Sequence, residues 1–161
     1  MTRAGTVIVG AAPQGFAIGI DVGGTKIAGG LVNLNDGSVS HPRRMPSQPS
    51  RPGMEVLADV KALLTEFVEK ARADGVPLAG AGVGVAELVD ADGDIFSGYR
   101  IAWNGLDVQG ILSEIINTRV EADVRAAALA EAIHGAGRPF RHFIYLSIGT
   151  GISTTLIQDG K

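Results

Sequence analysis

Residues 16–32, FAIGIDVGGTKIAGGLV, decide the fold of this chain. A first apolar run ends at Asp21, a glycine-rich turn follows, and a second apolar run begins after Lys26. Two strand-like runs joined by a short glycine-containing turn predict a β-hairpin. Glycines also let a backbone approach a phosphate group closely, and Thr25 and Lys26 add a hydroxyl and a positive charge. The turn therefore has the composition of a phosphate-binding site.

Asp21 closes the first predicted strand and is suited to hold a metal ion. Mg²⁺ usually keeps several waters and takes one or two carboxylates, so Asp21 would bind it through water. The stretch lacks the GxxxxGK[ST] spacing of a Walker loop and the GxGxxG spacing of a dinucleotide fingerprint. On the turn alone, a phosphate site and an ordinary hairpin with a solvated lysine are equal alternatives.

The composition fits one ordinary folded domain of 161 residues, of which 45% are hydrophobic. The net charge of −3 gives no bulk attraction to nucleic acid. The chain contains no cysteine, which excludes disulfides and thiolate metal sites and allows a reducing compartment. No stretch is long and apolar enough to span a membrane, so no membrane partner is expected.

The remaining chain predicts alternating strands and helices. In order they are an edge strand (38–45), a proline-rich loop (45–53), an amphipathic helix (54–73), a buried parallel strand (78–85), a second helix (107–117), a short strand (119–122), an alanine-rich helix that would pack closely (123–134) and a second hairpin (143–148 and 152–157). The order β-β-β-α-β-α-β-α followed by β-β predicts an α/β fold, with a mixed sheet that carries helices on its faces.

Five motifs, in this order, carry a resemblance to a known family: DVGGTK (21–26), GAGVGVAELVD (80–90), IAWNGLDVQGILSE (101–114), VEADVRAAALAE (120–131) and HFIYLSIGTGISTTLIQDGK (142–161). Together they resemble the ROK family (repressors, open reading frames, kinases), and its glucokinase-like sugar kinases in particular. The resemblance runs from Phe16 to the end of the sequence. It implies a ribonuclease H-like lobe of the actin and hexokinase type over residues 16–140, after an N-terminal tail (1–15). Residues 141–161 would be the first hairpin of a second lobe, and the glycine turns of the two hairpins would then face each other across a cleft.

The resemblance implies an ATP-dependent sugar kinase that uses Mg²⁺ to transfer the γ-phosphoryl group to a hexose or related polyol. Asp123 falls on the family's catalytic base, whereas its position alone favours a helix N-cap. A carboxylate base suits phosphoryl transfer, which otherwise needs positioning and charge stabilisation. Asp21 would organise the metal ion. The residues expected at the ATP phosphates are Asp21, Gly23, Gly24, Thr25, Lys26, Gly149, Thr150 and Gly151, and those expected at the substrate are Glu87, Arg100, Glu121 and Ala122.

Several positions depart from the family's pattern on the sugar side. Ala86-Glu87 replaces a Pro-Gly pair, Ala122 and Arg125 replace asparagines, and Arg100 falls where another asparagine is usual. Losing one hydrogen bond to a sugar hydroxyl costs on the order of 1–3 kcal/mol. After Gly151, Ser153, Thr154 and Thr155 replace the usual glycines. These departures imply an unusual polyol substrate or a lost activity.

Two alternatives to the kinase stay open. Family members continue well beyond the second hairpin with further sugar contacts, a zinc motif and the adenosine site, so the active site is expected to be incomplete as given. A non-catalytic lobe acting in ligand binding or protein interaction is the first alternative. A repressor is the second, but only fifteen residues precede Phe16, too few for a helix-turn-helix, and no basic patch indicates nucleic acid.

The start of the chain, MTRAGTVIVGAA (1–12), faintly resembles a secretory signal. We favour a tail that leads into the first strand, because the apolar run is short and a nucleotide-dependent hairpin belongs in the cytoplasm. A cytoplasmic location is therefore expected. A homodimer is common in the family and is a further expectation from the resemblance.

Overall fold

The computed structural model describes residues 15–48, 50–149 and 151–160. Most of the expected N-terminal tail, and the predicted phosphate contact Thr150, lie outside these residues. The elements are β1 (Phe16–Val22), β2 (Lys26–Asn33), β3 (Val39–Pro46), α1 (Gly53–Ala73), β4 (Leu78–Val85), α2 (Val108–Ser113), β5 (Thr118–Ala122), α3 (Asp123–Ile133), β6 (His142–Ile148) and β7 (Ile152–Gln158). Their order is the one predicted from the sequence.

Five strands form one mixed sheet in the order β3-β2-β1-β4-β5. The pairs β1–β2 and β2–β3 are antiparallel, and β4 and β5 run parallel to β1. Short turns join the antiparallel strands β1, β2 and β3 into a meander. A helix precedes each of the parallel strands β4 and β5, because parallel neighbours need a long crossover connection. β3 is an edge strand, and Pro42 and Pro46 are tolerated there because one side of an edge strand makes no ladder bonds. The topology confirms the predicted ribonuclease H-like lobe.

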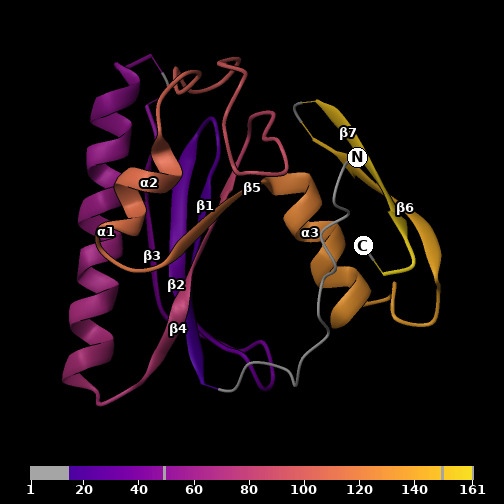
Figure 1. Cartoon of the computed structure of the whole chain (residues 1–161), viewed down its shortest axis with the longest axis horizontal. Coiled ribbons are helices and arrows are strands. Elements are labelled where there is room, and N and C mark those ends of the chain that lie inside the picture. Colours follow the sequence, from indigo (N-terminus) through magenta and orange to yellow (C-terminus); the bar gives the residue numbers. More distant parts are fainter. Residues whose placement is uncertain (1–14, 49, 150, 161) are drawn as a thin grey trace, which may run out of the picture.

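α1 and α2 cover one face of the sheet, and α3 lies on the other face with the β6–β7 hairpin beyond it (Figure 1). The face of α1 that packs on the sheet repeats apolar residues at helical spacing: Val56, Leu57, Val60, Leu63, Leu64, Phe67 and Ala71 are all buried. They meet alternate residues of β1, since Ile18, Ile20 and Val22 are buried as well. The hydrophobic core therefore lies between α1 and the sheet.

Gly53 and Trp103 fix the start of α1. The buried Trp103 indole N–H donates to the Gly53 carbonyl oxygen at 2.7 Å. A Cβ atom on residue 53 would lie 2.0 Å from the Ala102 carbonyl oxygen, so only glycine fits at this close approach. The loop that ends at Trp103 is thereby joined to the helix that carries most of the core.

Two helices differ from their predictions. α2 ends at Ser113, four residues earlier than predicted, because the chain turns there into β5 and the Ser113 hydroxyl pairs with the backbone of Thr118. α3 was expected to pack closely through its alanines, yet Ala128 is its one fully buried residue among those described. α3 is therefore held more loosely against the sheet than α1.

β4 was predicted to be buried on both faces, and this is wrong for one of them. Val83 and Val85 are buried toward α1, but Gly82 is exposed and, with Gly84, lines a cavity of about 930 Å³ between the sheet and α3. An uncharged strand is buried on both faces only if apolar side chains on each face pack against other elements, and glycine has no side chain to pack. Here the glycines leave the second face open.

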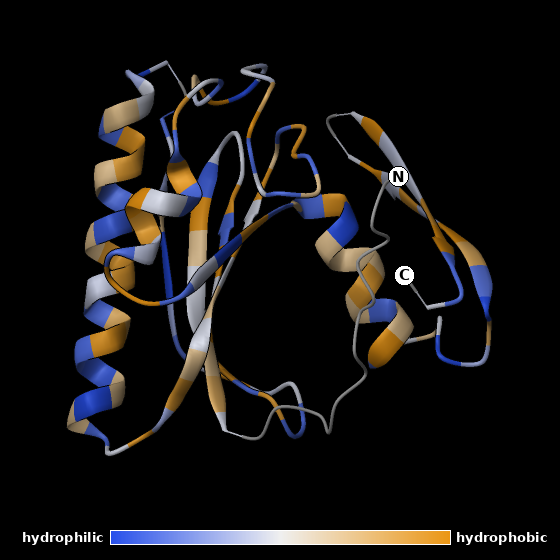
Figure 2. Ribbon diagram, in the orientation of Figure 1, coloured by the Kyte–Doolittle hydropathy of each residue, from blue (hydrophilic) through white to orange (hydrophobic). Residues whose placement is uncertain are grey.

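The β6–β7 hairpin forms a separate two-stranded sheet that packs against α3. Its two strands contain hydrophobic stretches (Figure 2), and Ile144, Leu146, Ile148, Ile152 and Leu156 are exposed. The division into lobes at residues 140 and 141 stays a prediction. Within the described ranges, no helix combines the length and apolar character needed to cross a bilayer.

Candidate functional site

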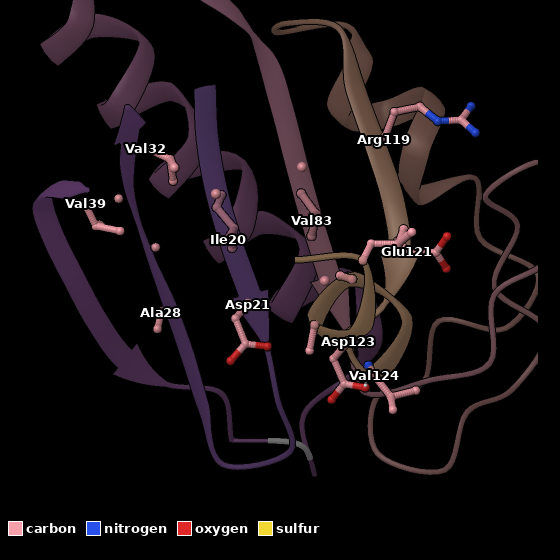
Figure 3. A pocket seen from close by; sticks show the side chains of 18 of the residues that line it. Ile20, Asp21, Ala28, Val32, Val39, Val83, Arg119, Glu121, Asp123 and Val124 are labelled. Atoms are coloured by element: carbon pink, nitrogen blue, oxygen red, sulfur yellow. Dashed lines mark hydrogen bonds between the residues drawn. The ribbon is translucent and has the colours of Figure 1, made fainter. Parts of the chain in front are cut away.

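Asp21 and Asp123 lie together at the open face of the sheet. Asp21 falls between the buried Ile20 and Val22 of β1, so the alternation of the strand points it away from the core and toward α3. Asp123 is the first residue of α3, directly after β5. Figure 3 shows both carboxylates on the wall of the same cavity. The strand end and the helix start thus bring together two acids that are far apart in the sequence.

The pKa of Asp21 is raised above its ordinary value. Partial removal from water at the cavity wall is the main cause, and repulsion from the charge of Asp123 adds to it. Lys26, at the start of β2, acts in the opposite direction. A site with two neighbouring carboxylates and a raised pKa favours a bound cation, which would relieve both the desolvation and the repulsion.

Asp123 is not the helix cap that its position alone suggests. Ala122 is the N-cap of α3 and makes no side-chain capping bond. The Asp123 carboxylate accepts a hydrogen bond from the Val124 amide at 2.7 Å, which holds it at the first turn. Its position at the mouth of two cavities leaves it available to a bound molecule.

The two glycine turns line one cavity of about 770 Å³, as the facing-hairpin prediction required. Its wall includes Gly23, Gly24 and Thr25 from the first turn, and Gly149 and Gly151 from the second. Asp123 lies on the wall of this cavity too. A phosphate chain between the turns would therefore reach Asp123. That these residues bind phosphate stays a prediction.

Glu87, predicted to contact substrate, organises a loop. Its side chain is 6% exposed, and its carboxylate accepts hydrogen bonds from the Ser97 hydroxyl and from the amides of Tyr99, at 3.0 Å, Arg100, at 2.5 Å, and Ile101, at 2.7 Å. Burial alone would raise the pKa of Glu87, but these donors together outweigh it and lower the pKa. Both oxygens are thus engaged inside the protein, although the residue borders the cavity. Sequence reasoning missed this role, because the partners follow ten to fourteen residues later in an irregular loop.

Arg125 and Glu121 form a second internal brace. The Arg125 guanidinium pairs with the Glu121 carboxylate and donates to the Val89 carbonyl oxygen at 2.6 Å. The Glu121 carboxylate also accepts from the Ala122 amide at 2.7 Å. This brace ties the first turn of α3 to the loop that follows β4. Contact of Glu121 or of Ala122 with a substrate stays a prediction.

The residues present fit Mg²⁺ only in the presence of a further ligand. Among the described residues, no group of three or more His, Cys, Asp or Glu side chains could hold a metal ion. Asp21 and Asp123 offer two carboxylates, which matches the preference of Mg²⁺ for one or two carboxylates plus waters and substrate phosphates. The donor set therefore suits an ion that arrives with a nucleotide.

The ROK family model matches residues 17–161 of the chain. A glucokinase of Streptomyces coelicolor is 32% identical over 155 residues, covering 92% of this chain and 45% of the relative. A xylose repressor of Bacillus subtilis is 30% identical over 146 residues, covering 89% of this chain and 37% of the repressor. The chain thus spans less than half the length of either.

The crystal structure of a ROK family glucokinase from Streptomyces griseus, in complex with glucose and AMPPNP, superposes with a TM-score of 0.76 at 26% identity. The match covers 91% of this chain and 46% of the glucokinase. The lobe described above is therefore shared by sugar kinases and by transcriptional regulators, and the likeness alone does not separate these two functions.

Proposed function

Since the chain belongs to the ROK family, we propose that it is part of an ATP-dependent sugar kinase that phosphorylates a hexose or a related polyol. One observation carries the proposal: Asp123 lies where the cavity of the carboxylate pair meets the cavity of the two glycine turns. A general base for phosphoryl transfer must face both the acceptor hydroxyl and the phosphate to be transferred. The position of Asp123 allows both.

The other residues have supporting roles in this proposal. Gly23, Gly24, Thr25 and Lys26, with the turn at Gly149–Gly151, would hold the phosphates of ATP. Asp21 would hold Mg²⁺ through water, and the ion would neutralise charge on the phosphates. Asp123 would orient the acceptor hydroxyl and take its proton. The homodimer and the cytoplasmic location stay predictions.

ADP release tests the proposal. The 161-residue chain and any longer product read in frame past Lys161 are assayed with Mg·ATP and a panel of hexoses, N-acetylhexosamines and cyclitols. Sugar-dependent release that is lost in Asp123→Asn but kept in Asp92→Asn, a matched change on an exposed turn, is the expected result. Removal of the general base is expected to lower the rate by about 10²–10⁴-fold. Equal activity of the two variants would refute the role of Asp123.

A non-catalytic lobe is the second candidate, favoured by the xylose repressor among the relatives. Regulators of this family carry the same lobe without any need for turnover. Binding of Mg·ATP or of sugar by a folded chain, with no ADP release from it or from the longer product, would establish this alternative. DNA retardation by the longer product would identify a regulator.

A further inference from the structure

The cavity of the two glycine turns is also lined by Glu87, Arg100, Ala122 and Asp123, which we call the acceptor wall. This wall offers few free groups that could recognise neutral hydroxyls. Ala122 has no polar side chain, and Glu87 is buried with both carboxylate oxygens bonded to the loop. The partly exposed Arg125 pairs with Glu121 and the Val89 carbonyl oxygen. Recognition of a neutral sugar needs paired hydrogen bonds from side chains that face the ligand. These three positions do not supply them, so selectivity for the acceptor has to come from another residue.

Arg100 is the charged residue on this wall whose side chain faces outward. Its backbone amide is fixed by Glu87 at 2.5 Å, and its aliphatic stem lies against Gly24, where an added Cβ would be 3.4 Å from the Arg100 Cδ. The residue is exposed and lines the cavity. Among the residues that the structure describes, its guanidinium makes no hydrogen bond and no ion pair. The backbone is thus anchored while the charge stays free.

We infer that Arg100 binds an anionic group on the acceptor, so that the preferred substrate is a sugar carrying a carboxylate or a phosphate. The inference rests on the proposed kinase function and narrows its substrate class. A guanidinium presents a planar fork of donors that matches a carboxylate or phosphate with two parallel hydrogen bonds. The anchored backbone fixes the base of the side chain beside Gly24, which limits where the fork can reach and reduces the entropy cost of binding.

The terminal phosphate of the nucleotide is the other anion that Arg100 could meet, because Gly24 belongs to the phosphate turn. Two observations favour the acceptor. Lys26 and the glycine turns already serve the phosphates in the proposed function. Arg100 also belongs to the loop anchored by Glu87 and lines the cavity together with Ala122 and Asp123, the residues expected on the acceptor side. The experiment below distinguishes an anion on the acceptor from the terminal phosphate of the nucleotide.

Calorimetric titration of the 161-residue chain, and of any longer product read in frame past Lys161, compares three probes in the presence of Mg·ATP: glucuronate, its uncharged analogue glucuronamide, and glucose 6-phosphate. The variants are Arg100→Ala and Arg100→Lys, with Arg138→Ala, an exposed arginine outside both cavities, as the matched control. We expect at least one anionic sugar to bind tenfold or more tightly than glucuronamide. Arg100→Ala should abolish this preference, Arg100→Lys should keep part of it, and Arg138→Ala should keep all of it.

Each outcome decides the inference. A preference for glucuronate over glucose 6-phosphate, or the reverse, assigns the anion as carboxylate or phosphate. Three outcomes overturn the inference: equal binding of glucuronate and glucuronamide, an anionic preference that survives Arg100→Ala, or no sugar binding at all. In each case, binding of Mg·ATP leaves the kinase proposal standing. Weaker Mg·ATP binding in Arg100→Ala, with the sugar preference unchanged, assigns Arg100 to the nucleotide and overturns it as well. A folded longer product that binds neither nucleotide nor sugar refutes both proposals.

Discussion

Replacement of Glu87 by glutamine removes the buried charge while keeping the volume of the side chain. The carboxylate has two oxygens that together accept from three backbone amides and one hydroxyl. Glutamine offers a single carbonyl oxygen, which can serve the amides of Arg100 and Ile101. Its NH₂ group then faces Tyr99 and Ser97, and only the Ser97 hydroxyl can turn to accept. One backbone amide is therefore left without an acceptor.

The cost follows from these contacts. A buried donor without a partner costs about 1–3 kcal/mol, and the two bonds that remain lose the added strength of a charged acceptor. We expect Glu87→Gln to lower the free energy of unfolding by about 2–4 kcal/mol at neutral pH. Glu69→Gln, an exposed glutamate on α1, is the matched control and should stay within about 0.5 kcal/mol of the wild type.

The effect should depend on pH, because the pKa of Glu87 is lower in the folded protein than its ordinary value of 4.5. A lowered folded pKa stabilises the protein fully above the unfolded pKa, and the stabilisation is lost as the pH falls through the folded value. Glutamine does not titrate. The difference between wild type and Glu87→Gln should therefore be full above pH 4.5 and shrink in more acidic solution.

Urea unfolding measures both quantities, since Trp103 is the only tryptophan, is buried, and follows the loop that Glu87 holds. Its fluorescence should change together with the far-UV circular dichroism if unfolding has two states. A decrease in the free energy of unfolding of less than about 0.5 kcal/mol at neutral pH would show that the hydrogen bonds to Glu87 contribute less than we infer. A difference that stays constant into the acid range would show that the charge of Glu87 is not what holds the loop.

Three further predictions follow from single contacts. Asp123→Asn should lower the pKa of Asp21 but leave it above its ordinary value, because the repulsion from Asp123 disappears and the desolvation of Asp21 remains. Carbon NMR of the Asp21 carboxyl measures this pKa, and an unchanged value would show that the two carboxylates do not interact. Gly53→Ala should destabilise by about 1–3 kcal/mol or more, since its Cβ would meet a backbone carbonyl, whereas Gly82→Ala, with open space around it, should change thermal stability by less than about 0.5 kcal/mol. Trp103→Phe should cost about 2 kcal/mol or more in a thermal melt monitored by circular dichroism, because it opens a cavity and removes the indole hydrogen bond to the Gly53 carbonyl oxygen; a shift no larger than that of Gly82→Ala would contradict it.

Periodicity and turn chemistry were sufficient to predict the elements. The bounds of β4 agree with the prediction, and α1 begins only one residue earlier than expected. The error in α2 has a local cause. Its apolar spacing continues to Ile115, but the register of β5 requires the chain to turn at Ser113, and a register between distant segments leaves no trace in helical spacing.

The site could be predicted only where a motif carries it. Asp21 was named from its place at a strand end and Asp123 from the family resemblance, and the structure places both on the wall of one cavity. The internal brace of Arg125 was not foreseen, because its acceptor on Val89 lies 36 residues away in a loop. Side chains that replace motif residues cannot be assigned to solvent, ligand or interior from the sequence, since that choice depends on which loop folds over them.

The position of these replacements bears on what the chain recognises. Glu87 and Arg125 are charged, yet both bind backbone groups of the same wall, one through amides and the other through carbonyls. A wall that lost its function would be expected to lose its order, because buried charges without partners destabilise a fold. Here the Glu87 carboxylate is matched by donors that keep the loop at residues 97–101 in place, and the Arg125 guanidinium is matched by Glu121 and the Val89 carbonyl oxygen. The replacements therefore fit a remodelled acceptor site better than an abandoned one, and the outward guanidinium of Arg100 is the group that this wall presents to its ligand.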